Sequence, residues 1–229
     1  MTTRKDFLVA STAAAALAPA AVNAATGSAS ASHAADIPAF VFDKAAFDAI
    51  ATRDVRHRFS FASEKLQGGQ ICYSMTNVLD ACDGALGEKP VSATSAAVLY
   101  HGTSLALGFN DVVWNEMFAK ALPKLAPSIR ADIADLKAGD GNQWLHKPKV
   151  GDYDASIDTL GKRGAVFFLC NNATTGFARS LATALGITPA AAYAKLTTNL
   201  VPHAMLVPAG VWAIHALQEA HFTYQQVTL

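Results

Sequence analysis

The clearest strand pattern in the chain is Ala165-Val166-Phe167-Phe168-Leu169-Cys170-Asn171-Asn172. Its first five residues are apolar without interruption, which is typical of a strand buried on both faces of a sheet. Phe177, Leu181 and Leu185 follow at a spacing of four residues, which predicts a helix over residues 173–185. We therefore expect Cys170 where a buried strand turns into a helix.

Cys170 has two interpretations. Ligands bind at the carboxyl edge of open α/β sheets, and the dipole of a nearby helix N-terminus favours a thiolate. These considerations make Cys170 a candidate nucleophile. The alternative is a small, inert cysteine in the core. The local pattern leaves both interpretations open.

The other segments alternate between strand and helix patterns. Strands are predicted at residues 56–62, 95–100, 203–207 and 222–227, and helices at 44–51, 64–86, 105–122, 129–136, 153–163, 189–196 and 208–218. A strand at 70–75 is a lesser alternative within the second helix. This order predicts an α/β domain over residues 56–229, a three-layer flavodoxin-like sandwich around a mostly parallel five-stranded sheet.

Residues 1–24 have the pattern of an export signal. Arg4 and Lys5 precede an alanine-rich apolar run, and Val22-Asn23-Ala24 is similar to a cleavage site. Residues 3–8 look like a twin-arginine (Tat) signal with Lys5 in place of the second arginine, so Sec export is the alternative. The run is too short to span a membrane. We expect a cleaved, periplasmic protein in which residues 25–55 form a linker and an N-terminal arm.

Composition and motifs exclude several function classes. The chain has 229 residues and a formal net charge of zero, so nothing favours nucleic acid or an anionic membrane surface as a partner. It contains no P-loop, G-x-G-x-x-G motif or Ser-His-Asp order, which argues against NTPases, dinucleotide enzymes and hydrolases. The seven histidines lack metal-site spacings, so no metal and no cofactor is expected.

Cys72 and Cys82 are predicted to lie on one helix. Ten residues of helix separate them by about 15 Å and about 80° around the axis, beyond disulfide reach. We expect no disulfide within the chain.

Several stretches, taken together, resemble the exported, single-domain branch of the DsrE/DsrF-like family. They are Val98-Leu99-Tyr100-His101-Gly102, Ile157-Asp158-Thr159-Leu160 before Gly164, residues 166–173, residues 200–202 through Val207-Pro208-Ala209-Gly210-Val211, and residues 216–224. The similarity covers roughly residues 56–229. The departures are His221, where the family usually has glycine, and a large insertion at 127–152.

The resemblance implies a subunit that assembles into homo-oligomers, commonly trimers or hexamers. In sulfur-relay members a cysteine after the third strand carries sulfur as a persulfide, and Cys170 is similar to that position. The implied function is an exported sulfur carrier or sulfurtransferase whose partner is a sulfur donor or acceptor protein or a small sulfur species. Because a fold does not settle a function, two alternatives remain. The nearer is a non-catalytic oligomeric module that binds a small ligand, and the more distant is a metal- or haem-binding protein.

The candidate site is expected at the carboxyl ends of the strands. Cys170 is the predicted catalytic residue, and an imidazole from His101 would lower its pKa if the two strands are neighbours. The alternative role of His101 is to structure its own turn. The predicted pocket residues are His101, Gly102, Asn171, Asn172, Pro208 and Gly210. We expect the insertion with Trp144 to lie over this pocket or near a subunit contact.

Overall fold

The computed structural model describes residues 37–87, 93–125, 127, 130, 138–146, 149–150 and 153–228. The expected export signal and the first part of the linker lie outside the described residues. So does the predicted helix at 129–136, apart from Arg130.

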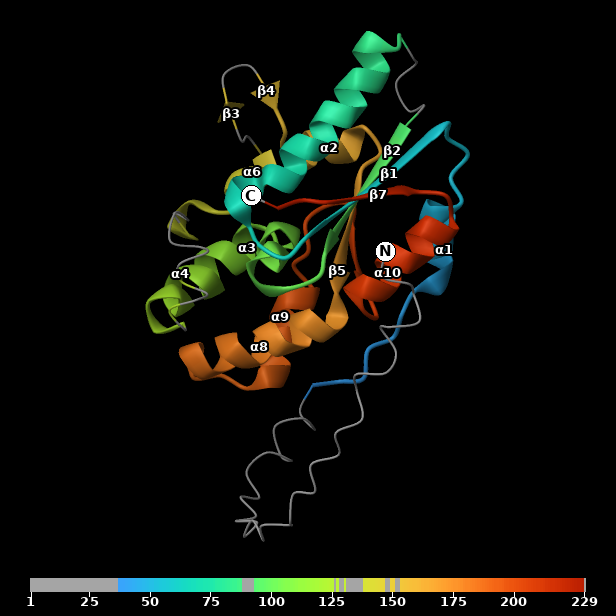
Figure 1. Ribbon diagram of the computed structural model, residues 1–229. Helices are drawn as coiled ribbons and strands as arrows, with labels where there is room; N and C mark the ends of the chain where they lie inside the picture. The colour runs from blue at the N-terminus through green and yellow to red at the C-terminus, as the bar shows by residue number, and fades with distance from the viewer. Residues whose placement is uncertain are drawn as a thin grey trace, which may run out of the picture.

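Five strands form the central sheet (Figure 1). They are β1 (His57–Ser63), β2 (Ala93–Leu99), β5 (Val166–Cys170), β6 (Ala204–Val207) and β7 (Thr223–Gln226), in the order β6-β5-β2-β1-β7. Every pairing is parallel, so the sheet is wholly rather than mostly parallel. The carboxyl ends of all five strands therefore meet at one edge.

Helices cover both faces of this sheet, which makes the fold a flavodoxin-like three-layer sandwich (Figure 1). One face carries α2 (Gln70–Asp80), α3 (Asp111–Val113), α4 (Ala119–Ala121), α8 (Asn171–Leu185) and α9 (Pro189–Thr197), and the other carries α1 (Lys44–Ala51) and α10 (Gly210–Glu219). Phe167 and Leu169 of β5 pack into the first core, whereas Val166 and Phe168 pack into the second. The apolar run of β5 is uninterrupted because both of its faces are covered.

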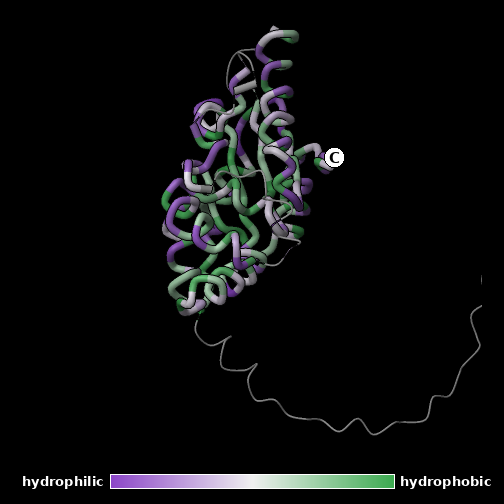
Figure 2. The backbone as a smooth tube through the Cα atoms, turned by 90° about the vertical axis from the view of Figure 1, so that its left-hand side faces the viewer, coloured by the Kyte–Doolittle hydropathy of each residue, from purple (hydrophilic) through white to green (hydrophobic). Residues whose placement is uncertain are grey.

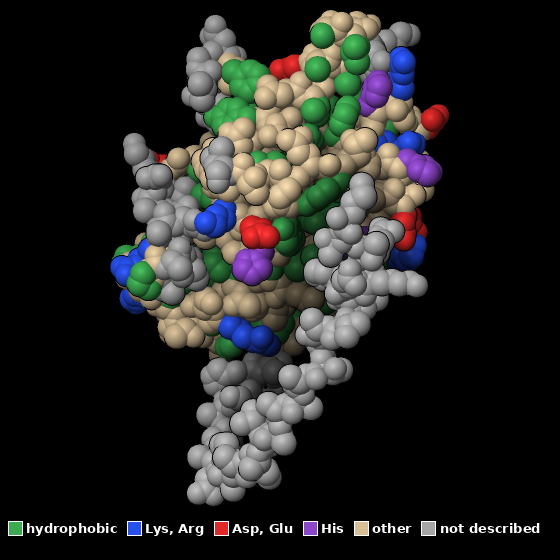
Figure 3. All heavy atoms as spheres, viewed as in Figure 1, with side chains coloured by type: hydrophobic (Ala, Val, Ile, Leu, Met, Phe, Trp, Pro, Cys, Tyr) green, Lys and Arg blue, Asp and Glu red, His purple; other side chains and the backbone are tan. Residues whose placement is uncertain are grey.

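Hydropathy follows this layering. In Figure 2 the hydrophobic backbone is concentrated in the middle of the molecule, with hydrophilic segments on the outer helices. On the face shown in Figure 3, charged side chains of both signs are scattered rather than gathered into a patch of one sign. In the part of the chain that the structure describes, no helix is both long and apolar enough to cross a bilayer.

The path of the chain creates a switch point at the carboxyl edge. The sheet first grows in one direction, from β1 through β2 and β5 to β6. The chain then returns through α10 and adds β7 on the other side of β1. The chain leaves β5 toward α8 on one face and leaves β6 toward α10 on the other. Such a divergence opens a crevice in open α/β sheets. Cys170 ends β5, and Pro208 directly follows β6.

The predicted helix over residues 64–86 is divided. It consists of a 3₁₀ turn, η1 (Gln67–Gly69), then α2 and a π-helical end, η2 (Ala81–Ala85). Gly68 and Gly69 have left-handed backbones that interrupt the helix before Gln70. The alternative strand at 70–75 is wrong, because those residues lie in α2.

The predicted helix over 105–122 is also fragmented. Its parts are η3 (Gly102–Gly108), α3, η4 (Trp114–Phe118), α4 and η5 (Leu122–Lys124). It divides at Asn110, whose side chain accepts a hydrogen bond from the Val112 backbone and starts α3 as a new helix.

The predicted helix over 153–163 begins later than expected. Tyr153–Asp154 form β4, which pairs with β3 (Lys149–Val150), and α7 (Ile157–Lys162) starts after Ser156. The Ser156 hydroxyl accepts a hydrogen bond from the Thr159 backbone and caps the helix. The insertion contributes two further short elements, η6 (Ala138–Asp140) and α6 (Gln143–His146).

The two ends of the described chain complete the second layer. The N-terminal arm packs on α10, because the rings of Phe42 and Phe47 lie 5.1 and 5.0 Å from that of Trp212. His221 joins α10 to β7 with φ of 66°, the left-handed backbone for which glycine is the usual residue. Cys72, Cys82 and Cys170 are all buried, and no disulfide joins any two of them.

Candidate functional site

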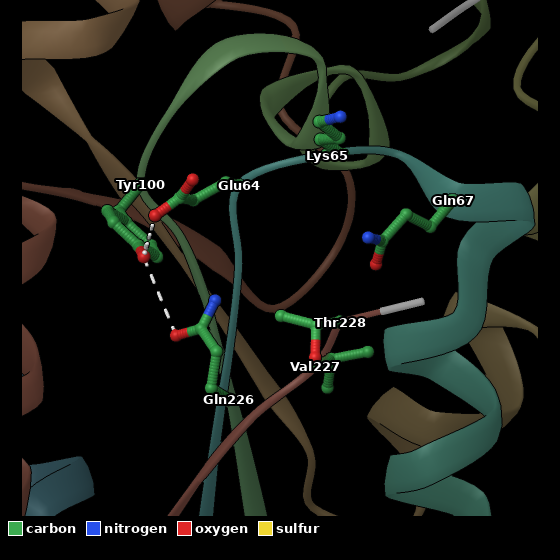
Figure 4. Close-up of a pocket in the computed structure, with 7 residues that line it drawn as sticks. All are labelled: Glu64, Lys65, Gln67, Tyr100, Gln226, Val227 and Thr228. Carbon is green, nitrogen blue, oxygen red and sulfur yellow. Dashed lines mark hydrogen bonds between the residues drawn. The ribbon is translucent and has the colours of Figure 1, made fainter.

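A cavity of about 360 Å³ lies at the carboxyl edge of the sheet, beside the ends of β1, β2 and β7 (Figure 4). It is lined by Glu64, Lys65, Gln67, Tyr100, Gln226, Val227 and Thr228. These residues come from three segments far apart in the sequence. They meet because the strands that carry them are parallel neighbours.

Tyr100 organises one wall of this cavity. Its hydroxyl donates to Glu64 Oε1 at 2.6 Å and lies 3.5 Å from Gln226 Oε1, which also accepts from the Tyr224 hydroxyl at 2.5 Å. Burial and the neighbouring Glu64 carboxylate raise the pKa of Tyr100 to about 12. At neutral pH the Tyr100 hydroxyl is therefore protonated and acts as a donor, which orients the Glu64 carboxylate.

Gln67 faces the cavity from the opposite wall and combines two unfavourable features (Figure 4). Its φ is 46°, a left-handed conformation that is uncommon for a residue other than glycine. Its amide oxygen is also buried without a hydrogen-bond partner. Backbone strain and unsatisfied buried polar groups concentrate at functional sites. Gln67 is the strongest sign of a binding site here.

The loop that carries Gln67 is supported from behind by the insertion. Trp144 is buried, and its indole nitrogen donates to Gly68 O at 3.1 Å. A β-carbon at Gly69 would lie 1.9 Å from that nitrogen. The Thr103 hydroxyl holds the other end of the loop by accepting from the Leu66 backbone at 3.1 Å. Trp144 thus finds its cover within its own chain, against the loop that forms the cavity.

His146 fastens the same part of the insertion to the domain. Its Nδ1 lies 2.8 Å from Asp158 Oδ2 and its Nε2 lies 3.2 Å from Asp111 Oδ2. Hydrogen bonds to Asp158 and Asp111 raise the pKa of His146. Asn142 adds an anchor, since its side chain donates to the carbonyl oxygens of Leu107 and Phe109 at 3.1 and 2.7 Å.

The structure places Cys170 at the predicted junction. It is the last residue of β5 and the N-cap of α8, where its sulfur accepts a hydrogen bond from the Ala173 backbone at 3.4 Å. The side chain is 5% exposed and is not among those lining the cavity. The reactivity of the Cys170 thiol remains a prediction.

His101 is not paired with Cys170. Their strands are neighbours, as the hypothesis required, but Leu99 stands opposite Leu169, so the register sets Tyr100 level with Cys170. Among the residues that the structure describes, no hydrogen bond or ion pair joins His101 to Cys170. His101 is exposed, and its carbonyl oxygen accepts from Ser104 Oγ at 2.8 Å.

None of the other predicted residues is among those lining the cavity, and only the two glycines lie next to it. A β-carbon at Gly210 would lie 1.9 Å from Tyr100 Cβ, and one at Gly102 would lie 3.1 Å from Glu64 O. These glycines allow close contact with two lining residues. The remaining predicted residues lie on the Cys170 side: Asn171 accepts from the Tyr193 hydroxyl at 2.5 Å, Asn172 is exposed and Pro208 is half-buried.

Sequence reasoning missed the residues that line the cavity. Tyr100 precedes the predicted His101 and was overlooked beside it. The Gln67-Gly68-Gly69 stretch carried a usable signal, because paired glycines inside a helical pattern indicate an interruption. No sequence signal points to Gln226, because only the pairing of β7 with β1 brings this residue to the site.

A second cavity, of about 330 Å³, lies near the amino ends of β2 and β5. Arg53 donates there to Gly164 O at 2.7 Å and to Thr94 Oγ1 at 3.3 Å, holding the segment that enters β5. No group of three or more histidine, cysteine or acidic side chains within the described ranges is arranged to bind a metal ion.

The chain matches no family model and no curated protein. Among solved structures it is similar to a protein of unknown function from Methanobacterium thermoautotrophicum. The identity is 13% and the TM-score is 0.38, over 75% of this chain and 99% of the other. Function therefore has to be argued from the chemistry of the site.

Proposed function

We propose that this protein is a non-catalytic module that binds a small polar molecule in the cavity at the carboxyl edge of the sheet. The observation that carries the proposal is the buried, unpartnered amide oxygen of Gln67, held on a strained backbone in the cavity wall. A ligand donor would satisfy this oxygen, and an unsatisfied buried group costs about 1–3 kcal/mol.

The chemistry of the lining favours binding over catalysis. Tyr100 holds its proton at neutral pH and therefore does not act as a base. The described lining residues include no thiol and no imidazole, the usual nucleophile and proton-transfer groups. The lining offers hydrogen-bond donors and acceptors whose side chains hold one another in place, as in Tyr100 and Glu64. Such an arrangement is suited to binding a polar ligand.

The substitution Gln67→Gly tests this function. Glycine accepts the left-handed backbone without strain, so the melting temperature should stay level or rise, while binding loses the amide. The test is a calorimetric and NMR screen of small polar metabolites against wild type and variant. Gln218→Ala, on the exposed side of α10, is the control that should bind normally. Ligands that bind both variants equally would count against this cavity.

Sulfur carriage at Cys170 is a second candidate, favoured by the hydrogen bond from the Ala173 backbone and by the family resemblance. A Cys170 thiolate would attack the outer sulfur of thiosulfate, form a persulfide bond and release sulfite with the electrons of the broken bond. Intact mass spectrometry after incubation with thiosulfate tests it. Gain of one sulfur atom in wild type but not in Cys170→Ser supports the carrier, and no gain in wild type opposes it.

We also propose that the mature protein is periplasmic and assembles into a trimer or hexamer. Apolar side chains exposed on α10 and the arm support the assembly: Val41 is 87%, Val211 58% and Trp212 37% exposed. Such a surface is typical of a contact with a second copy. Light scattering of wild type and Val211→Glu checks this. We expect an oligomer that the variant weakens, and a monomeric wild type at micromolar concentration would contradict it.

A further inference from the structure

The cavity carries both signs of charge on successive residues. Glu64 and Lys65 are its charged lining residues, and both are exposed at its rim. Among the described residues no ion pair joins these two side chains to each other. The described part of the lining therefore offers one carboxylate and one ammonium group, whose charges cancel.

The lining of the cavity also offers both hydrogen-bond donors and hydrogen-bond acceptors to a ligand. Gln226 Oε1 accepts from the Tyr224 hydroxyl, and the Tyr100 hydroxyl lies nearby, so the Gln226 amide NH₂ is the part that remains for a ligand. Together with Lys65 it forms the donor set of the cavity. Glu64, oriented by Tyr100, and the free oxygen of Gln67 form the acceptor set. In Figure 4 the Glu64 and Gln226 side chains lie on one side of the cavity and Gln67 on the other.

From this arrangement we infer that the ligand is a small zwitterion of the amino-acid type with a hydrogen-bond donor in its side chain. The inference rests on the proposed binding function. The ligand ammonium lies against Glu64, its carboxylate against Lys65 and the Gln226 amide, and its side-chain donor meets Gln67 Oε1.

A ligand with a single charge fits less well. A simple cation leaves the Lys65 ammonium facing a like charge, and a simple anion does the same to Glu64, so each is disfavoured by repulsion as well as by a missing contact. A cavity of about 360 Å³ is at the small end of ligand sites, which suits a free amino acid better than a peptide.

A matched series of probes tests the inference by calorimetry on the mature protein. The common amino acids are screened first, and serine is then compared with ethanolamine, glycerate and alanine. These analogues lack the carboxylate, the ammonium and the side-chain donor respectively. We expect an amino acid with a polar side chain to bind, and we expect loss of either charged group to weaken binding at least about tenfold.

Two charge variants assign the contacts. Glu64→Gln should remove the preference for serine over glycerate, and Lys65→Gln should remove the preference for serine over ethanolamine. Both residues are exposed, so folding should be unaffected. Lys120→Gln and Glu219→Gln, which remove exposed charges elsewhere, should leave both preferences unchanged.

The possible outcomes distinguish a failure of this inference from a failure of the proposed binding function. If amino acids fail but a neutral or singly charged molecule binds wild type and not Gln67→Gly, the ligand class is wrong and the binding function stands. If amino acids bind with affinity that Glu64→Gln and Lys65→Gln leave unchanged, the assigned contacts are wrong. If no small polar molecule binds at all, the proposed function fails with the inference.

Discussion

The indole nitrogen of Trp144 donates a hydrogen bond to the carbonyl oxygen of Gly68 at 3.1 Å. This contact links the insertion to the loop in the cavity wall, since Gln67 directly precedes Gly68. The close approach requires glycine at position 69, where a β-carbon would meet the indole at 1.9 Å. The insertion does not line the cavity itself. It supports the backbone of the loop that places Gln67 in the cavity wall.

Trp144→Phe tests that support. The variant loses the donor to Gly68 O and part of a buried ring, which should cost about 1–3 kcal/mol of the free energy of unfolding. Hydrogen exchange should rise at the Gly69 amide, which in wild type donates to Leu66 O at 2.8 Å. Trp212→Phe, a partly exposed tryptophan on α10, is the matched control. Unchanged exchange at Gly69 in Trp144→Phe would contradict the supporting role.

A pair of glycine substitutions tests the packing beside Tyr100. Gly210→Ala would place a β-carbon 1.9 Å from Tyr100 Cβ and 2.9 Å from Tyr100 Cα, so the start of α10 must move. We expect a loss of about 1–3 kcal/mol. Gly176→Ala, in α8, meets no atom within 4 Å and should stabilise by about 0.5–1 kcal/mol. Chemical denaturation measures the unfolding free energy of both variants. Equal changes in this free energy would show that Gly210 is not closely packed.

His146 makes the anchoring of the insertion depend on pH. The Asp158 and Asp111 carboxylates raise its pKa in the folded protein above the unfolded value, which is about 6.5. The stability from this contact is thus fully present below about pH 6.5 and is lost as the pH rises through the raised folded pKa.

The measurement is the difference in unfolding free energy between wild type and His146→Gln at several pH values from about 5.5 to 8.5. We expect the difference to shrink as the pH rises. A difference that grows with pH would reverse the assigned sign.

Cys170 can be tested by labelling rather than by melting alone. Serine in its place keeps an acceptor for the Ala173 amide and should melt within a few degrees of wild type, whereas alanine loses the cap and about 1 kcal/mol. Burial raises the pKa of Cys72 to about 12, which makes that thiol an inert reference. Alkylation of the folded protein at Cys170 but not at Cys72 is expected for a reactive site. Equal resistance of both thiols would make Cys170 a core residue.

The sequence by itself determined the sheet and its layers. The uninterrupted apolar run from Ala165 to Leu169 is typical of a strand buried on both faces, and the strand and helix patterns that alternate around it predict the α/β layers. The position of Cys170 at the end of that strand was equally predictable. These features depend on hydrophobic patterns that extend over a few neighbouring residues.

Only the tertiary structure decided the site. Glu64, Tyr100 and Gln226 are separated by more than 35 positions in the chain and meet because β1, β2 and β7 are parallel neighbours with their ends at one edge. The register set Tyr100, not His101, level with Cys170. The loop that carries Gln67 is held by a hydrogen bond from the distant Trp144. Contacts of this kind come from strand order, register and packing, which no local pattern of residues encodes.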